Sequence, residues 1–339
     1  MSGQDESKTG RDAVESEIPT IDLAAFLTGT EGERRRIADR VDQICRAIGF
    51  LIIKHHGISQ EISDTAWSAA RAFFDLPLGA KLEARSEKPG CPRGYFPLNE
   101  ESLARTRGIA APPDPKESYS SGPLSAPAGH GTSGDFDFFY GPNIWPVEPG
   151  NFREAWMDYY RAMQYLGSQV MRLLASALRL TDDYFVKFHT HELSALRALN
   201  YPSTNDTSPP GQQRAGAHSD YGSVTILKPD PSVPGLEIRL PSGKWIAAPL
   251  VSDAFIVNVG DLMARWTNDR WVSTLHRVAH PDNSAGNPTP RRQSIAYFMN
   301  PNYDAEIRAI PTCLPAGGTA TYAPVLAGEY LITQFRSAN

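Results

Sequence analysis

The second half of the chain carries a series of short apolar runs that restrict it to an antiparallel β fold. The runs follow one another at close intervals after about Leu196, and Pro, Gly, Asn and Asp turn residues separate them: ALRALNY, SVTILK, LEIRL, AFIVNV and SIAYFM. Short strands with turn signals at this spacing are typical of an antiparallel sandwich or barrel. The pattern therefore predicts a β core in this half.

The rest of the chain supplies helices. Apolar residues at three- and four-residue spacing predict a helix over Glu31–Ile48, and Phe50–Ile53 follows it as a short buried strand after the break at Gly49. Further helices are predicted over Ser59–Phe74 and over Phe152–Leu180, which has the longest apolar stripe. Helices packed on a β core, without alternating parallel strands, make the expected fold class α+β.

The chain divides into three predicted segments. Residues 1–17 are polar and are expected to form a disordered tail. Residues 18–150 form an N-terminal region that is rich in Pro, Gly and Ser loops after Ser86, part of which we expect to act as a lid. Residues 151–339 contain the long brace helix and the β core, and we expect them to form one compact unit with 18–150.

Composition restricts the partners. The net charge is -5, with 33 Lys and Arg mixed among 38 Asp and Glu, so no basic stripe is available to neutralise a nucleic acid backbone. No apolar stretch approaches the roughly 18 residues of a membrane helix, and the N-terminus lacks an apolar leader segment. We expect a cytoplasmic protein that binds neither nucleic acid nor membrane, acts on a small molecule, and is a monomer or weak homo-oligomer.

The chemistry is carried by His218-Ser219-Asp220 and by His276, which follows 58 residues after the first histidine (276 minus 218). Residues i and i+2 of a strand face the same way, so His218 and Asp220 can both point into a barrel mouth. Two imidazoles and one carboxylate around a metal leave coordination positions open, as in non-haem iron(II) sites that use O2. An HxD pair alone is weak evidence, because a lone His is more often structural.

A second pair, Arg292 and Ser294, opens the apolar strand IAYF and shares one strand face. A guanidinium and a hydroxyl that converge in this way make a carboxylate clamp, since Arg binds a carboxylate with two prongs and stays charged when buried. Such a clamp suits the distal carboxylate of 2-oxoglutarate. The alternative is that Arg292 is a surface salt-bridge partner.

The chain resembles the isopenicillin N synthase-like iron(II)/2-oxoglutarate-dependent dioxygenases, over nearly its whole length from Ile18 to Phe335. In the second half the resemblance rests on AHSDYGSVTIL, PGLEIRLPSGKWIAAP, FIVNVGDLMARWTNDRWVSTLHRV and RRQSIAYF. In the first half it rests on IPTIDL, Gly49-Phe50, His56-Gly57, Arg93-Gly94-Tyr95, Lys116-Glu117 and GPNIWP. The resemblance implies a distorted double-stranded β-helix (jelly roll), with Fe(II) in its open mouth and with 2-oxoglutarate and O2 as cosubstrates.

The resemblance also assigns roles by position. His218, Asp220 and His276 match the family's iron ligands, and Arg292 with Ser294 matches its RxS motif. Asn200-Tyr201-Pro202 falls where relatives have Asn-Tyr-Tyr-Pro, so Asn200 and Tyr201 are expected to help hold 2-oxoglutarate. One Tyr of the motif is absent here, and the alternative is that both residues simply end a strand.

Three further side chains are candidates for the substrate pocket. Tyr95 and Phe298 are expected to line it, with ordinary aromatic packing as the alternative. Lys228 follows the strand TIL and would attract an acidic substrate if it faced the pocket, whereas an exposed lysine at a strand end is the simpler interpretation.

The predicted function is oxidation of a small molecule of specialised metabolism, with release of succinate and CO2. Hydroxylation is the default, and desaturation, cyclisation or epoxidation are the other outcomes. One alternative is an oxidase of the isopenicillin N synthase type, in which the Arg and Ser pair binds the substrate and no 2-oxoglutarate is consumed. Another is a catalytically silent binding protein on the same barrel. Fold resemblance does not identify the substrate.

Overall fold

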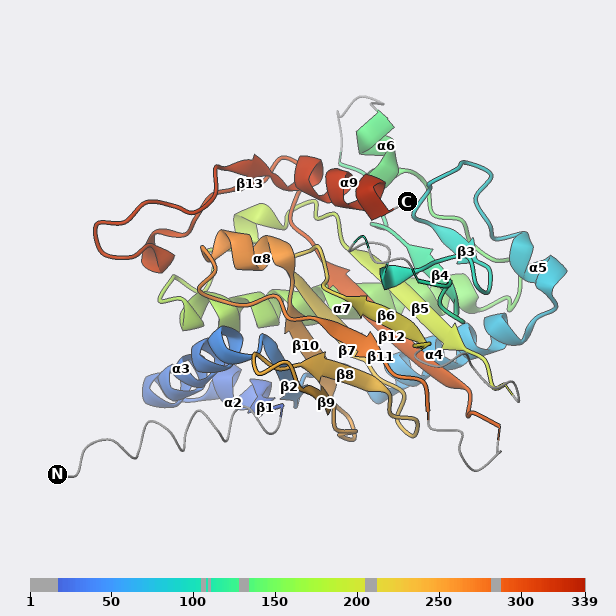
Figure 1. Cartoon of the computed structure of the whole chain (residues 1–339), viewed down its shortest axis with the longest axis horizontal. Helices are drawn as coiled ribbons and strands as arrows, with labels where there is room; N and C mark the ends of the chain where they lie inside the picture. Colours follow the sequence, from blue (N-terminus) through green and yellow to red (C-terminus); the bar gives the residue numbers. More distant parts are fainter. Residues whose placement is uncertain are drawn as a thin grey trace.

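The computed structural model of the protein describes residues 18–104, 108, 111–127, 134–204, 212–281 and 288–338. The predicted tail, residues 1–17, lies outside the described residues. Figure 1 shows helices on the outside of a β core, as expected for the α+β class. No helix within the described ranges is long and apolar enough to cross a bilayer.

Within the described ranges the largest sheet has eight strands in the order β1-β2-β10-β7-β12-β5-β4-β3. The β1 and β2 strands are parallel, and the other neighbours are antiparallel. Their bounds are β1 Thr20–Asp22, β2 Phe50–Lys54, β3 Gly94–Phe96, β4 Glu117–Ser121, β5 Ala195–Tyr201, β7 Val224–Lys228, β10 Phe255–Val259 and β12 Arg292–Met299.

A second antiparallel sheet has the order β6-β11-β8-β9 among the described residues, and in Figure 1 it lies in front of the larger sheet. Its strands are β6 Ala215–His218, β8 Leu236–Arg239, β9 Trp245–Ala247 and β11 His276–Val278. A short hairpin of β13 (Glu306–Ile307) and β14 (Val325–Leu326) stands apart. The runs that the sequence marked as strands thus form the two sheets.

Helices cover the outer side of the large sheet. The long helix α7 (Phe152–Ala177) packs on α3 (Glu31–Ala47), α4 (Gln60–Asp75) and β12, and its apolar stripe is buried. These three helices agree with the predicted ranges within a few residues. The remaining helical elements are α2 Leu23–Thr28, α5 Leu78–Leu82, α6 Gly134–Tyr140, α8 Asp261–Trp266 and α9 Ala327–Ala338, with 3-10 turns η2 Val186–Phe188 and η3 Pro311–Cys313.

Local sequence explains how α3 leads into β2. Thr30 and Glu33 form a capping box, in which each side chain accepts from the other residue's backbone N–H at the start of the helix. Gly49 then adopts φ +64°, and a Cβ there would lie 2.1 Å from the carbonyl oxygen of Val272. Only glycine allows this turn and this close approach, so the chain passes directly from the helix into the centre of the sheet.

The segment from Ser86 to Gly150 is more structured than its composition suggests. We predicted mostly loop, but β3, β4 and α6 lie within it. The β4 strand has the polar sequence ESYSS, and all five residues are buried. It extends the sheet beyond β5, so the N-terminal region contributes strands to both ends of the large sheet.

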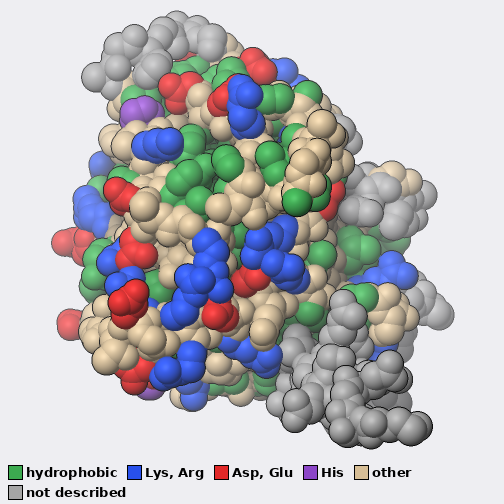
Figure 2. Space-filling view, turned by 90° about the vertical axis from the view of Figure 1, so that its left-hand side faces the viewer, with side chains coloured by type: hydrophobic (Ala, Val, Ile, Leu, Met, Phe, Trp, Pro, Cys, Tyr) green, Lys and Arg blue, Asp and Glu red, His purple; other side chains and the backbone are tan. Residues whose placement is uncertain are grey.

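The surface is mixed in charge. On the face shown in Figure 2, Lys and Arg side chains lie among Asp and Glu side chains and hydrophobic side chains.

Candidate active site

The three predicted metal ligands meet where β6 and β11 pair. His218 ends β6, His276 begins β11, and the two residues are direct partners in the sheet register, so their ring centroids lie 4.3 Å apart. Asp220 follows β6, and its Oδ1 is 3.8 Å from Nε2 of His218 and 3.6 Å from Nε2 of His276. One ligand atom from each residue lies within 4.8 Å of the other two. The spacing of HxD and the distant His therefore produces the predicted cluster.

Hydrogen bonds fix the orientation of both imidazoles. Nδ1 of His218 lies 2.8 Å from the carbonyl oxygen of Gly216, and Nδ1 of His276 lies 3.1 Å from that of Thr274. A carbonyl oxygen can only accept, so each Nδ1 is the donor, and Nε2 of each ring is the nitrogen that lies toward Asp220. This is the arrangement that a metal-binding histidine requires.

The carboxylate is oriented in the same way. Oδ2 of Asp220 accepts from the Thr225 hydroxyl at 2.6 Å and from the Asn258 amide at 2.7 Å. These two contacts hold one oxygen, so Oδ1 is directed to the imidazoles.

The pKa shifts of His218 and Asp220 favour the protonation states in which these side chains bind a divalent cation. Burial, together with the nearby His276, lowers the pKa of His218 to about 4, so its ring is neutral at physiological pH. Burial would raise the pKa of Asp220, but His276, His218 and the two hydrogen bonds outweigh it and lower this pKa. Two imidazoles and one carboxylate form the set that holds non-haem Fe(II), and the donors present here fit that ion.

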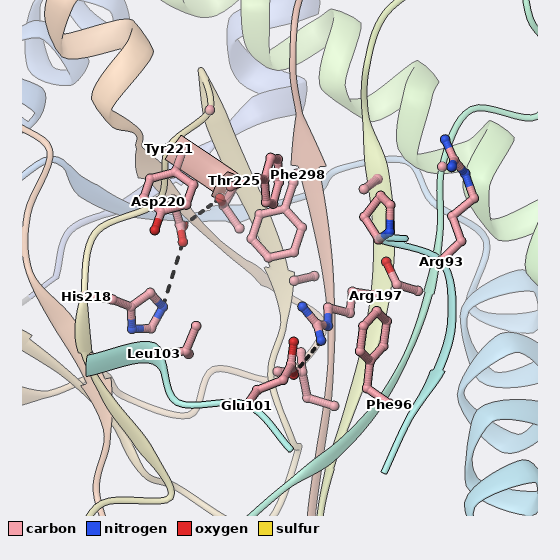
Figure 3. A pocket seen from close by; sticks show the side chains of 18 of the residues that line it. Arg93, Phe96, Glu101, Leu103, Arg197, His218, Asp220, Tyr221, Thr225 and Phe298 are labelled. Atoms are coloured by element: carbon pink, nitrogen blue, oxygen red, sulfur yellow. Dashed lines mark hydrogen bonds and ion pairs between the residues drawn. The ribbon is translucent and has the colours of Figure 1, made fainter. Parts of the chain in front are cut away.

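The triad opens into a cavity of about 910 Å³ between the two sheets. Alternate residues of β12 line it, because the side chains of a strand point to opposite faces in turn. These residues are Arg292, Ser294, Ala296 and Phe298. In Figure 3, His218 and Asp220 lie on one side of the open centre, and Phe298 and Arg197 lie on the other.

Arg292 is a buried cation that no carboxylate of the described ranges neutralises. It is 2% exposed, its Nη1 donates to Ser294 Oγ at 3.3 Å, and its Cζ lies 5.2 Å from the Tyr201 ring centroid. Its Nε has no hydrogen-bond partner, and no carboxylate of the described residues lies within ion-pair distance. Such burial excludes the surface salt-bridge alternative. An unpaired buried charge is costly, so the site is suited to a carboxylate ligand.

A second guanidinium strengthens the positive charge at this end. Arg214 is also buried, with its Cζ 6.0 Å from the same Tyr201 ring, and burial together with the charge of Arg292 lowers its pKa to about 10. Its Nη2 donates to a backbone carbonyl, and its Nη1 has no hydrogen-bond partner among the residues that the structure describes. Sequence reasoning missed Arg214, because nothing in its spacing separates it from a surface arginine.

Asn200 and Tyr201 face opposite sides of β5. Tyr201 lines the cavity, but Asn200 points to the opposite face of β5 and is absent from the cavity wall. There its amide donates to Glu117 at 2.8 Å, and its oxygen accepts from Arg291 at 2.7 Å. Neighbouring residues of a strand cannot both face one pocket. The geometry does not support a direct cosubstrate contact for Asn200.

The three pocket candidates also divide. Phe298 and Tyr95 line the cavity, although the Tyr95 hydroxyl donates to Glu117 at 2.5 Å. Lys228 lies on the opposite face of β7, where its ammonium contacts Ser63 at 2.5 Å and Asp64 at 3.9 Å. It is not part of the cavity wall, so a role in attracting substrate is not supported.

Sequence reasoning overlooked Thr225 and Asn258. Each is a polar residue inside an apolar strand, in SVTILK and AFIVNV. A polar side chain in such a run must find a buried partner, and this signal could have marked both residues.

Comparison with known proteins supports the interpretation of the site. Residues 18–148 match the family described as non-haem dioxygenase in morphine synthesis N-terminal, and residues 192–301 match the 2OG-Fe(II) oxygenase superfamily. Validamycin A dioxygenase of Streptomyces hygroscopicus subsp. limoneus is 33% identical over 93% of this chain and 85% of its own length. Homoarginine-6-hydroxylase of Oryza sativa subsp. japonica is 32% identical over 93% of this chain and 95% of its own length.

Solved structures agree with the fold. The crystal structure of a full-length Neurospora crassa protein in complex with alpha-KG and thymine has a TM-score of 0.83 and 33% identity, and the match covers 96% of this chain and 98% of that one. A putative 2OG-Fe(II) oxygenase family protein from Caulobacter crescentus has a TM-score of 0.81 and 27% identity, with coverage of 96% and 100%. The predicted jelly-roll core is thereby confirmed.

Proposed function

The chain belongs to the 2OG-Fe(II) oxygenase superfamily and is an Fe(II)/2-oxoglutarate-dependent dioxygenase, and from this premise we propose that it oxidises a C–H bond of a small specialised metabolite. Hydroxylation is the proposed outcome. Desaturation, cyclisation or epoxidation follow if the substrate is held differently. The family membership predicted from the sequence is confirmed, whereas the identity of the substrate stays a proposal.

His218, Asp220 and His276 are the proposed Fe(II) ligands. Their orientation by the carbonyls of Gly216 and Thr274 supports this role, because the ligand atoms are held in place before metal arrives. Three protein ligands leave positions for cosubstrate and O2.

Arg292, Ser294 and Tyr201 are the proposed anchor for the distal carboxylate of 2-oxoglutarate. A two-pronged contact from the guanidinium would neutralise its unpaired charge, and the Ser294 hydroxyl lies beside it at 3.3 Å. Arg292 also holds Tyr201 through a cation–π contact, and the ring closes this end of the cavity.

When bound, Fe(II) and 2-oxoglutarate supply the oxidising chemistry. O2 takes two electrons from 2-oxoglutarate, which gains one oxygen atom and becomes succinate and CO2. O2 takes two more electrons from the substrate C–H bond, and in a hydroxylation the carbon gains the second oxygen atom. The protein supplies orientation. Phe298 and residues of both sheets line the space beside the triad, and the triad and the clamp set the direction from which the substrate meets it.

The relatives differ in the molecules that their names mention, which include validamycin A, homoarginine and proline. These names suggest a small polar metabolite for this chain too, without selecting one.

One observation carries the 2-oxoglutarate proposal: a fully buried, unpaired Arg292 lines the same cavity as the triad. The test is anaerobic titration of the Fe(II) protein with 2-oxoglutarate, followed by a succinate assay in air. We expect the visible metal-to-ligand charge-transfer band and slow succinate formation. His276→Ala is the matched dead control. Absence of both band and succinate in the wild type would favour the oxidase or the silent binding protein.

A further inference from the structure

A pair of charged residues lies on the cavity wall away from the proposed 2-oxoglutarate anchor. Alternate residues of β5 line the cavity, and Arg197 precedes Tyr201 by four positions. At about 3.3 Å per residue, this places the two backbones roughly 13 Å apart along the strand. Figure 3 shows Arg197 beside Glu101, facing His218 and Leu103 across the open centre. This wall is therefore free to contact a substrate while 2-oxoglutarate is bound.

The cluster around Arg197 is balanced in charge. Glu101 pairs with Arg197 at 2.5 Å and with Lys116 at 3.1 Å, and Lys116 also lies 3.4 Å from Asp114. Burial would raise the pKa of Glu101, but Arg197 and Lys116 outweigh it and lower this pKa to about 2, so the carboxylate is ionised. Two cations face two anions. The cluster lacks the surplus charge that would attract an ionised substrate, in contrast to Arg292.

The side-chain hydrogen bonds of this ion pair involve one guanidinium nitrogen of Arg197 and one carboxylate oxygen of Glu101. Arg197 donates from Nη2 to Glu101 Oε2 and to the Ser118 hydroxyl, and Lys116 also donates to Oε2. Within the described part of the chain, Arg197 Nη1 and Glu101 Oε1 have no hydrogen-bond partner. Phe96 packs on the guanidinium at 4.9 Å and holds its plane. Arg197 and Glu101 both line the cavity, so a donor and an acceptor of the same ion pair remain for a ligand.

We propose that Arg197 and Glu101 form the substrate-recognition pair of this oxygenase, and that they bind a neutral cyclic amide, such as a lactam, cyclic imide or cyclic urea. The C=O of such a group would accept from Arg197 and its N–H would donate to Glu101. A ring forces the amide to be cis, so both groups lie on the same edge, whereas a trans amide directs them to opposite edges. This inference rests on the proposed function, since it names the substrate class of the same site.

The space between this pair and the triad suits the rest of such a molecule. Leu103, Phe298 and Tyr221 line it (Figure 3), and Phe298 offers an aromatic side chain against which a ring can pack. The polar edge would be held by charge-assisted hydrogen bonds, and the apolar remainder would extend toward His218, where oxidation takes place.

The test uses matched pairs of small probes on the Fe(II) protein with 2-oxoglutarate. Each pair is a cyclic amide and its N-methyl derivative, for example 2-piperidone with N-methyl-2-piperidone and thymine with 1,3-dimethylthymine. N-methylation removes the donor but keeps the ring. We measure the anaerobic perturbation of the charge-transfer band and the stimulation of 2-oxoglutarate turnover in air. We expect the N–H member to bind at least about tenfold more tightly.

Variants then locate the contact. Arg197→Met should raise the KM of the preferred amide roughly 100-fold, and Glu101→Gln about tenfold, with an unchanged KM for 2-oxoglutarate. Arg197→Lys keeps the positive charge and is expected to fold. Its KM for the preferred amide should lie between those of the wild type and Arg197→Met. Arg85→Met is the matched control, because Arg85 forms a similar pair with Glu100 at 2.6 Å at the exposed rim of the cavity.

Three outcomes would overturn the proposal: N-methyl members that bind as well as their partners, a panel in which no cyclic amide stimulates turnover, or an unchanged amide KM in a folded Arg197 variant. Each requires that the wild type still forms the band with 2-oxoglutarate. Absence of the band would count against the proposed function instead, so the two failures are distinguishable.

Discussion

The carboxylate ligand depends on two side chains that do not contact metal. Thr225 and Asn258 both donate to Oδ2 of Asp220 and thereby direct its other oxygen to the imidazoles. We predict that Thr225→Val lowers Fe(II) affinity by about 10- to 100-fold, because the carboxylate loses one of the contacts that orient it. Thr225→Ser keeps the hydroxyl and is the control. An Fe(II) titration that is monitored through the 2-oxoglutarate charge-transfer band measures the affinity. Equal Fe(II) affinities of Thr225→Val and the wild type would contradict the prediction.

The neighbouring residues Arg291 and Arg292 allow a specific contact with 2-oxoglutarate to be distinguished from a general effect of positive charge. Arg292 faces the cavity, whereas Arg291 contacts Asn200 and Asp75 on the other face of the sheet. We predict that Arg292→Lys raises the KM for 2-oxoglutarate roughly 100-fold, because an ammonium keeps the charge but loses the two-pronged contact. Arg291→Lys should leave this KM unchanged. Steady-state succinate formation measures both KM values. A similar rise of the KM for 2-oxoglutarate in both variants would refute the assignment of the clamp.

At this scale two spacings were informative: HxD and RxS each place two residues at i and i+2, and these pairs reach the metal cluster and the cavity wall. His276 joins the cluster from a separate strand. The sequence did not allow Arg197 and Glu101 to be paired. They lie 96 residues apart, with Glu101 in the loop after β3 and Arg197 on β5, and the fold brings this loop against the strand. A contact between a loop and a distant strand leaves no local pattern, so no spacing rule could find this pair.

The β5 strand shows how alternation decides function at the level of an element. Tyr201 and Asn200 are adjacent in sequence, yet only Tyr201 reaches the cavity. We predict that Asn200→Ala lowers the free energy of unfolding by about 1–3 kcal/mol, because Glu117 and Arg291 lose a buried partner, while the KM for 2-oxoglutarate stays within about twofold. Denaturant unfolding and the succinate assay measure the two quantities. A tenfold rise in this KM at unchanged stability would restore the cosubstrate role expected from the sequence.

The elements that sequence analysis found are those that bury apolar residues, either in a regular period or in a continuous run. The α7 stripe has the helical period, SIAYFM is a continuous apolar run, and both elements were predicted near their observed positions. The β4 strand was missed because its buried residues are polar: Glu117 and Ser118 hydrogen-bond to Asn200 and Arg197 of the neighbouring strand. Burial that is compensated by hydrogen bonds leaves no hydrophobic signal.

Across the whole molecule, the N-terminal region completes the catalytic barrel. The β2 strand pairs with β10 and β4 pairs with β5, so residues of both family regions share one sheet. The Glu101–Arg197 pair crosses the same junction, and Asp114 accepts from the backbone N–H of Gly216 at 3.0 Å, two residues before the first histidine ligand. Loss of these contacts would therefore affect global stability as well as the cavity.

Acid stability tests this junction. The ordinary pKa of Glu101 is 4.5, and Arg197 and Lys116 lower it to about 2 in the folded protein despite burial. Between these pH values the unfolded chain binds a proton that the folded chain does not, so stability falls as the pH decreases. The contribution of Glu101 is present above pH 4.5 and is lost as the pH falls to about 2. Its size is about 1–3 kcal/mol.

We therefore predict that Glu101→Gln unfolds more readily than the wild type at neutral pH, and that the difference disappears by about pH 2. Asp114, Lys116 and Ser118 are unchanged in the variant, so the difference between the two pH profiles isolates this one carboxyl group. Glu100→Gln is the control, because Glu100 is partly exposed and forms its ion pair with Arg85 at the rim. Urea unfolding at a series of pH values gives the comparison. Parallel profiles for wild type and Glu101→Gln would mean that the junction is not held by this charge, and that other contacts between β4 and β5 carry the stability.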